Sequence, residues 1–154
     1  MAQEWDFTKS PAPKVRKALS KPVGGWRGGS NGHAVLSAKN RVLHVKTTGG
    51  DPQLVSGPLK VPAGKYVFSL RMNASAGGGG LLFTRSSKEG YRAGSGTPFS
   101  VKHDNNWHEI SIPLERDHDI SEIRLDPCTA NGSLQIEWMR LTTADGKVVK
   151  EWKF

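Results

Sequence analysis

The chain has 154 residues, and its 22 Lys and Arg against 14 Asp and Glu give a formal net charge of +8 at pH 7. A single cysteine, Cys128, excludes an internal disulfide, and 18 Gly with 9 Pro leave no long run of apolar residues at helical spacing. These totals argue against a helical bundle and favour one domain, residues 1–154, of short strands joined by turns. The charge favours an anionic partner, such as an acidic or sulfated glycan, nucleic acid or an anionic membrane surface. Solubility together with a basic arm explains the charge equally well.

The N-terminal segment predicts one short strand followed by two loops. Glu4–Thr8 alternates aromatic and polar residues, as a strand does. Residues 9–21 contain five cations and two prolines and predict a basic loop or flexible arm. Residues 23–29 are rich in glycine around Trp26, which either plugs the end of the core or faces outward from a loop.

A hairpin is predicted next, with strands at residues 33–37 and 41–47 around a turn at 38–40. Residues 53–61 then predict an extended segment. Pro58 confines that segment to a sheet edge or a bulge because proline has no N–H to donate to a neighbouring strand.

The strongest strand pattern is Gly64–Asn73, which we expect to form the central strand of a two-layer sandwich. Side chains alternate across a strand, so one face of this segment is apolar and the other is polar. The apolar positions are Tyr66, Phe68, Leu70 and Met72. The opposite face carries Arg71 and Asn73 and is the first place to look for function.

Six further strands are predicted after this one, at residues 81–85, 99–102, 107–114, 120–126, 134–142 and 147–154. Together they give about ten to twelve short strands, which is typical of an all-β, two-layer antiparallel β-sandwich of the jelly-roll type. Trp5 and Phe7 in the first strand are expected to pair or pack with Trp152 and Phe154 in the last, which would bring the termini together.

Three outward-facing polar residues are candidates for ligand binding: Arg71, Asn73 and Arg124. Arginine supplies a planar fork of donors that suits sugar hydroxyls, carboxylates and sulfates. The alternative is a surface charge or an ion pair of the arginines with Glu109, Glu122 or Asp126.

Aromatic side chains are the second group of candidates, because their faces stack on sugar rings or bases. They are Trp26, Tyr91 and Trp107, each with a role in the core as its alternative. Residues 86–98 form a long polar loop that holds Tyr91 and Arg92, and loops of this length often bind something. Nucleic acid is not expected, since no recognition helix or RNA-binding signature occurs.

The sequence offers little for catalysis or metal binding. No nucleophile elbow, phosphate loop, HExxH or CxxC occurs, and the five histidines lack metal-ligand spacing. If the termini pair, Glu4, Asp6 and Asp145 could converge on a structural calcium ion, which prefers oxygen ligands. No signal peptide or membrane span is recognisable.

Several short motifs occur in order along the chain: Trp5-x-Phe7, Gly25-Trp26, residues 49–52 (GGDP), residues 64–72 (GKYVFSLRM), residues 106–109 (NWHE) and residues 123–127 (IRLDP). This pattern resembles the jelly-roll carbohydrate-binding modules with galactose-binding-domain-like folds, in particular modules appended to bacterial sulfatases and glycoside hydrolases. The resemblance implies a β-jelly roll, often with structural calcium, that binds sugar on a strand face or in loops at one end. It also implies an extracellular or periplasmic protein and an attached catalytic domain.

The sequence therefore predicts a non-catalytic module for an acidic or sulfated polysaccharide. Two alternatives stay open. One is a structural or protein-interaction sandwich accessory to a hydrolase or sulfatase. The other is a small polysaccharide lyase, for which only Tyr91, His103, His108 and the arginines are available as an acid and a base.

Overall fold

The computed structural model describes residues 21–91 and 95–154. The predicted strand at Glu4–Thr8, its pairing with the last strand and nearly all of the basic segment 9–21 lie outside these residues. The described part contains 11 strands and no helix, so it has no helix that could cross a membrane.

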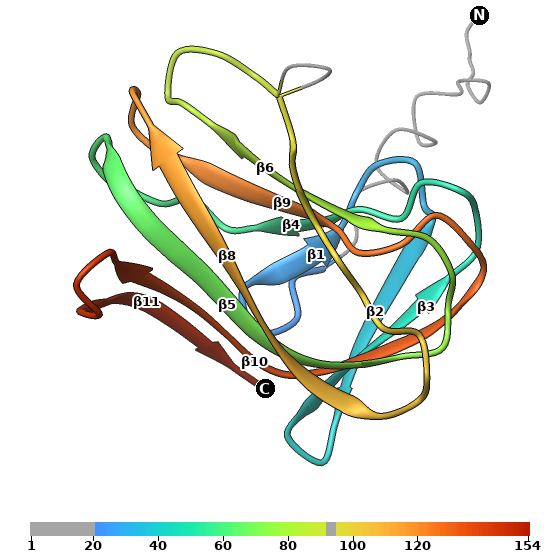
Figure 1. Cartoon of the computed structure of the whole chain (residues 1–154). Coiled ribbons are helices and arrows are strands. Elements are labelled where there is room, and N and C mark those ends of the chain that lie inside the picture. Colours follow the sequence, from blue (N-terminus) through green and yellow to red (C-terminus); the bar gives the residue numbers. More distant parts are fainter. Residues whose placement is uncertain (1–20, 92–94) are drawn as a thin grey trace, which may run out of the picture.

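The strands form two antiparallel sheets that lie face to face (Figure 1). The five-stranded sheet has the order β1 (Trp26–Gly28), β4 (Leu54–Ser56), β9 (Glu122–Asp126), β6 (Gly80–Arg85) and β7 (Thr97–Phe99). The six-stranded sheet has the order β2 (Ala34–Lys39), β3 (Val42–Thr47), β10 (Gly132–Thr143), β5 (Gly64–Ala74) and β8 (Trp107–Arg116), and β11 (Val148–Lys153) also pairs with β10. The predicted all-β sandwich is confirmed.

Strand β5 is the long inner strand that the alternation predicts. It pairs with β10 on one side and β8 on the other. All four apolar positions of its inner face, from Tyr66 to Met72, are buried, while Arg71 and Asn73 face outward and are partly exposed. The outer face of β5 therefore lies between the outer faces of β8 and β10.

A cluster of three aromatic side chains fills one end of the core. The ring centre of Trp26 lies 5.2 Å from that of Trp152 and 6.2 Å from that of Phe68, both with edge-to-face geometry. Trp26 is 0% exposed and begins β1, so the predicted glycine-rich loop is wrong at this point. Burial of the indole between the sheets favours a short strand here despite the glycines around it.

Two strand boundaries also differ from prediction. Strand β4 ends at Ser56 and pairs with both β1 and β9, so it is an inner strand that stops before Pro58. Strand β7 covers Thr97–Phe99, earlier in the chain than the predicted strand at 99–102. Backbone hydrogen bonds resume from Leu59 to Ser121 and between Val61 and Ile120, so Pro58 interrupts the pairing and does not mark a sheet edge.

Strand β10 determines how the larger sheet is put together. One of its edges pairs with β5 along nearly its whole length. The other edge pairs first with β3, up to Ile136, and then with β11, from Trp138 onward. Between Ile136 and Trp138 the pairing with β5 shifts in register, which marks a β-bulge.

Candidate functional site

The outer face of β5, β8 and β10 carries two tryptophans together with polar side chains. We call this surface the platform, and its members are Arg71, Asn73, Trp107, Trp138 and Arg140. Cross-strand pairing places them side by side, since Asn73 is opposite Trp107, and Arg71 is opposite Trp138. All five are partly exposed.

The β-bulge explains why Trp138 belongs to this face. Ile136 and Met139 are both buried, so the two residues between them, Glu137 and Trp138, lie on the outer side. A bulge puts one extra residue into one strand and thereby changes the alternation of its side chains. Trp138 and Arg140 were not predicted as site residues. Only knowledge of the bulge would have revealed them.

Arg71 is held between carboxylates and an indole. Its Nε donates to Oε1 of Glu137 at 2.8 Å, and its Nη1 lies 4.0 Å from Oε2 of Glu109. Its guanidinium carbon lies 5.4 Å from the centre of the Trp107 ring. These contacts fix a flexible side chain in one orientation beside an aromatic surface.

Arg140 repeats this arrangement on the neighbouring strand. Its Nε and Nη2 both lie 2.9 Å from Oε2 of Glu151, and its guanidinium carbon lies 4.3 Å from the centre of the Trp138 ring. An exposed cation–π contact of this kind contributes about 0.5–1 kcal/mol. The contacts of Arg71 with Trp107 and of Arg140 with Trp138 thus order two indole rings on one sheet face.

A row of hydrogen-bonding side chains crosses the same face. Through strand pairing, His44 lies opposite Gln135, Gln135 opposite Asn73, and Asn73 opposite Trp107. The Nδ2 of Asn73 donates to the carbonyl of Asn105 at 3.1 Å, which orients the amide. Amides and imidazoles both donate and accept, as sugar hydroxyls do.

The spacing of the two indoles suits an extended ligand. Trp107 in β8 and Trp138 in β10 lie on either side of β5. Their partners in β5, Asn73 and Arg71, are two residues apart along the strand. With strands about 4.8 Å apart and a rise of about 3.4 Å per residue, the Cα atoms of the two tryptophans are separated by roughly 12 Å along a diagonal. This is about the length of two pyranose units, so the rings could stack on alternate sugars of one chain.

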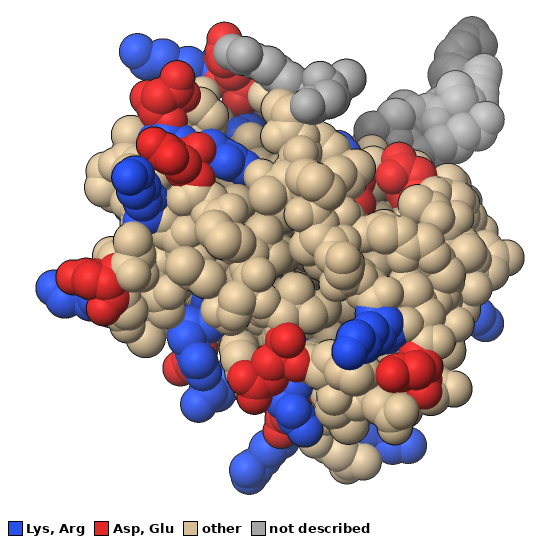
Figure 2. Space-filling view, in the orientation of Figure 1, with Lys and Arg blue, Asp and Glu red and all other residues tan. Residues whose placement is uncertain are grey.

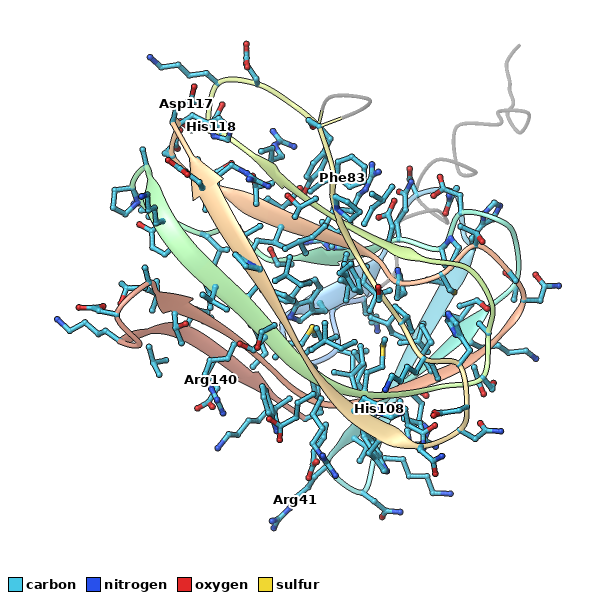
Figure 3. All side chains as sticks on the ribbon, in the orientation of Figure 1. Arg41, Phe83, His108, Asp117, His118 and Arg140 are labelled. Atoms are coloured by element: carbon cyan, nitrogen blue, oxygen red, sulfur yellow. The ribbon has the colours of Figure 1, made fainter. Side chains whose placement is uncertain are left out.

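The other predicted ligand-binding residues are not on the platform. Trp26 has no exposed surface and cannot contact a ligand, because it packs into the core. Tyr91 and Arg124 lie on the outer side of the five-stranded sheet, next to Phe83. Figure 3 shows Phe83 and Arg140 on opposite sides of the sandwich. Arg92 lies outside the described residues.

Arg124 and Tyr91 form a cluster whose polar groups bind one another. Arg124 donates from Nε and Nη2 to both carboxylate oxygens of Asp126 at 3.0 Å, as the ion-pair alternative predicts. Its guanidinium carbon lies 4.2 Å from the Phe83 ring centre and 5.1 Å from that of Tyr91. The hydroxyl of Tyr91 donates to Glu122 at 2.8 Å. The carboxylate of Asp126 and the hydroxyl of Tyr91 are thus bonded within the cluster.

Burial shapes the ionisation of this cluster. It raises the pKa of Tyr91 far above 10.0, and the hydrogen bond to Glu122 adds to the effect. It also raises the pKa of Asp126, although the hydrogen bonds and charge of Arg124 act in the opposite direction. Both shifts fit a packed, partly dry cluster on the face opposite the platform.

The predicted calcium ligands are only partly described. Asp145 lies in the turn between β10 and β11 and accepts a hydrogen bond from the hydroxyl of Thr143, which lowers its pKa. Glu4 and Asp6 lie outside the described residues. Within residues 21–91 and 95–154, no three His, Cys, Asp or Glu side chains gather closely enough to hold a metal ion. The calcium site stays a prediction.

Two hollows adjoin the platform. A groove of about 380 Å³ runs between β7 and β8, lined by Pro98, Phe99, Ile110 and Pro113 among others. Figure 2 shows that charged side chains gather at the rim of this view and leave its centre uncharged. A second pocket of about 250 Å³ lies beside Trp138, at the opposite side of the platform from β8.

Comparison with known proteins bears on the fold. No protein-family model matches the chain, and no curated protein matches its sequence. Among solved structures, the C-terminal CBM6 of LamC, a marine laminarinase from Zobellia galactanivorans, is similar with a TM-score of 0.54 and 16% identity. That match covers 76% of this chain and 91% of the other.

Two larger structures contain a similar unit. The CBM22-1–GH10 modules of xylanase 10B from Clostridium thermocellum, complexed with xylohexaose, match with a TM-score of 0.57 and 14% identity over 79% of this chain and 26% of that one. The enzymatically active domain of tailspike protein 4 from bacteriophage CBA120 matches with a TM-score of 0.56 and 6% identity over 73% and 18%. The chain thus has the jelly-roll fold of carbohydrate-binding modules, as the sequence resemblance implies. At these identities the similarity establishes the fold alone.

Proposed function

We propose that this chain is a non-catalytic carbohydrate-binding module that holds an extended glycan across the platform. The observation that carries the proposal is the pair of partly exposed indoles, Trp107 and Trp138, on one sheet face with oriented polar side chains between them. Stacking on the rings and hydrogen bonds to hydroxyls are the interactions that such a ligand needs. The shared fold with CBM6 and CBM22 modules supports the same assignment.

The surface offers little support for a protein-docking sandwich. The large hydrophobic side chains exposed among the described residues are Val35, Leu81, Val148 and Val149. Val148 and Val149 adjoin in β11, but Val35 belongs to β2 and Leu81 to β6, and neither of those strands pairs with β11. Scattered residues of this kind are normal on a soluble surface, whereas docking faces show a contiguous apolar patch.

The wider setting of the module is also part of the proposal. A preference for acidic or sulfated glycans is expected from the net charge of +8. A role beside a catalytic domain, outside the cell or in the periplasm, follows from the resemblance to appended modules. Each of these expectations can fail while sugar binding on the platform stands.

The test is a binding survey with platform variants. Wild type, Trp107→Ala and Trp138→Ala are compared by affinity electrophoresis against neutral and acidic polysaccharides, and hits are measured by calorimetry. Each truncation is expected to weaken binding at least about tenfold, as the loss of a central aromatic contact usually does.

Tyr91→Phe is the control, because it alters an aromatic residue that packs against the opposite sheet. It should bind like wild type. If no polysaccharide binds, or if both tryptophan variants bind as well as wild type, the proposed function is wrong.

A further inference from the structure

The pocket beside Trp138 lies where the larger sheet changes partner strands. Arg41, Glu137, Trp138, Lys153 and Phe154 line it, and its volume is about 250 Å³. Strand β3 leaves the edge of β10 at Ile136, and β11 joins the same edge at Trp138. The pocket therefore brings together the β2–β3 turn, the bulge in β10 and the end of β11.

Positive charge in this pocket is not fully compensated. Glu137 is already bonded to Arg71 at 2.8 Å. Lys153 lies 3.8 Å from Glu151, but that carboxylate is bound more closely by Arg140 at 2.9 Å. In the described part of the chain, Arg41 makes no ion pair. Two cations thus line the pocket beside Trp138 and Phe154, while Glu137 is bonded to Arg71 and Glu151 to Arg140.

The backbone at Arg41 is unusual for an arginine. Its φ is 65°, and that of the preceding Asn40 is 54°, so both central residues of the tight β2–β3 turn are left-handed. This turn type favours Asn followed by Gly, and a side chain in the left-handed region costs roughly 1–2 kcal/mol. Glycine would suit the backbone better but would supply no charge. Figure 3 shows Arg41 projecting on the same side of the molecule as Arg140.

We propose that this pocket binds the anionic group of one sugar unit, a carboxylate or a sulfate, in a glycan that lies on the platform. The inference rests on the proposed function and deepens it, because it assigns acidic preference to Arg41 and Lys153. Trp138 belongs to both surfaces, so a sugar stacked on its ring can direct an acidic substituent into the pocket. Arginine and lysine bind such oxyanions through charge-assisted hydrogen bonds.

The experiment compares polymers that share a backbone and differ in charge. Hydroxyethylcellulose, carboxymethylcellulose and cellulose sulfate form the glucan set, and agarose and κ-carrageenan form the galactan set. Wild type should bind a charged member about tenfold more tightly than its neutral counterpart at low salt, and the difference should shrink as salt screens the charges. The carboxylated and sulfated polymers distinguish the two anions.

The decisive variant is Arg41→Gln with Lys153→Gln. It should lose the preference for charged polymers and keep the affinity of wild type for the neutral ones. A double variant of equal charge change, Lys60→Gln with Lys88→Gln, alters exposed lysines away from the pocket and should keep most of the preference.

If both double variants reduce the preference equally, or if wild type binds neutral and charged polymers alike, the pocket inference is wrong while glycan binding stands. If wild type binds no member of either set, the proposed function fails together with the inference.

Discussion

The guanidinium of Arg71 meets the carboxylate of Glu137 at 2.8 Å between the neighbouring strands β5 and β10. Glu137 faces outward because it follows the buried Ile136, and the bulge keeps the next residue, Trp138, on the same outer side. The bulge thus places the second indole of the platform next to the carboxylate that orients Arg71. Removing the carboxylate should separate the effect on binding from the effect on stability.

Glu137→Ala is expected to weaken binding of a neutral glycan about threefold to tenfold and to lower the free energy of unfolding by less than about 1 kcal/mol. Arg71 loses its closest partner and with it a fixed orientation, while an exposed ion pair contributes little to stability. Calorimetry and urea unfolding measure the two quantities. Glu115→Ala, which removes a carboxylate opposite Lys65 on the same sheet, is the control. Equal affinity of the two variants would contradict a positioning role for Glu137.

Trp26 should behave as a core residue in every assay. Trp26→Ala is expected to cost about 3–5 kcal/mol of unfolding free energy, because it empties a fully enclosed site against Phe68 and Trp152. Trp26→Phe should cost less, since it keeps a ring and removes a buried indole N–H that has no acceptor among the described residues. Urea denaturation measures the loss of unfolding free energy in each variant. If Trp26→Phe keeps the stability of wild type but binds glycan more weakly, Trp26 takes part in binding and the assignment to the core alone is wrong.

Strands β5 and β10 show what the alternation of apolar and polar residues can and cannot predict. The period of two along Gly64–Asn73 correctly separates the buried Phe68 from the outward Arg71, because β5 pairs with β8 in regular register and the extra residue of the bulge lies in β10. Applied without a break from Ile136, the same period would place Trp138 inside the core. The bulge reverses that assignment, and it depends on pairing with segments far away in sequence. Local pattern therefore predicts three of the five platform residues, Arg71, Asn73 and Trp107.

The short strand β1 was missed for a similar reason. It contains three residues between glycines, and its partner β4 lies about thirty residues further on. A segment this short carries no alternation that can be read, so only its packing against β4 reveals it as a strand. Tyr91 follows β6, and Arg124 lies in β9. Both residues lie on the other side of the sandwich from Arg71 because β6 and β9 join the five-stranded sheet. That choice is made by the topology and is not encoded in the period of any single strand.

Tyr91 should make stability fall at alkaline pH. Its raised pKa means that the folded chain keeps the phenol proton where the unfolded chain loses it. The contribution of Tyr91 to stability is therefore complete below about pH 10, the ordinary tyrosine value, and declines as pH rises above it. Wild type should be more stable than Tyr91→Phe near neutrality, and the difference should shrink above pH 10. Urea unfolding of both proteins across this range gives the difference, and a constant value would show that Tyr91 ionises normally.

Arg41→Gly should raise the free energy of unfolding and lower the preference for charged polymers. Glycine relieves the left-handed strain at φ 65°. Its greater freedom in the unfolded chain offsets part of that gain, so the free energy of unfolding should rise by about 0.5–1 kcal/mol. The same change removes one of the two cations of the pocket and should lower the preference for a charged over a neutral polymer by about threefold or more. Thermal unfolding and the matched polymer sets measure the two effects on one protein. Arg41→Lys, which keeps the charge and the strain, should preserve selectivity without the gain in stability. A stabilised Arg41→Gly protein with full selectivity would show that the turn, and not its charge, accounts for this arginine.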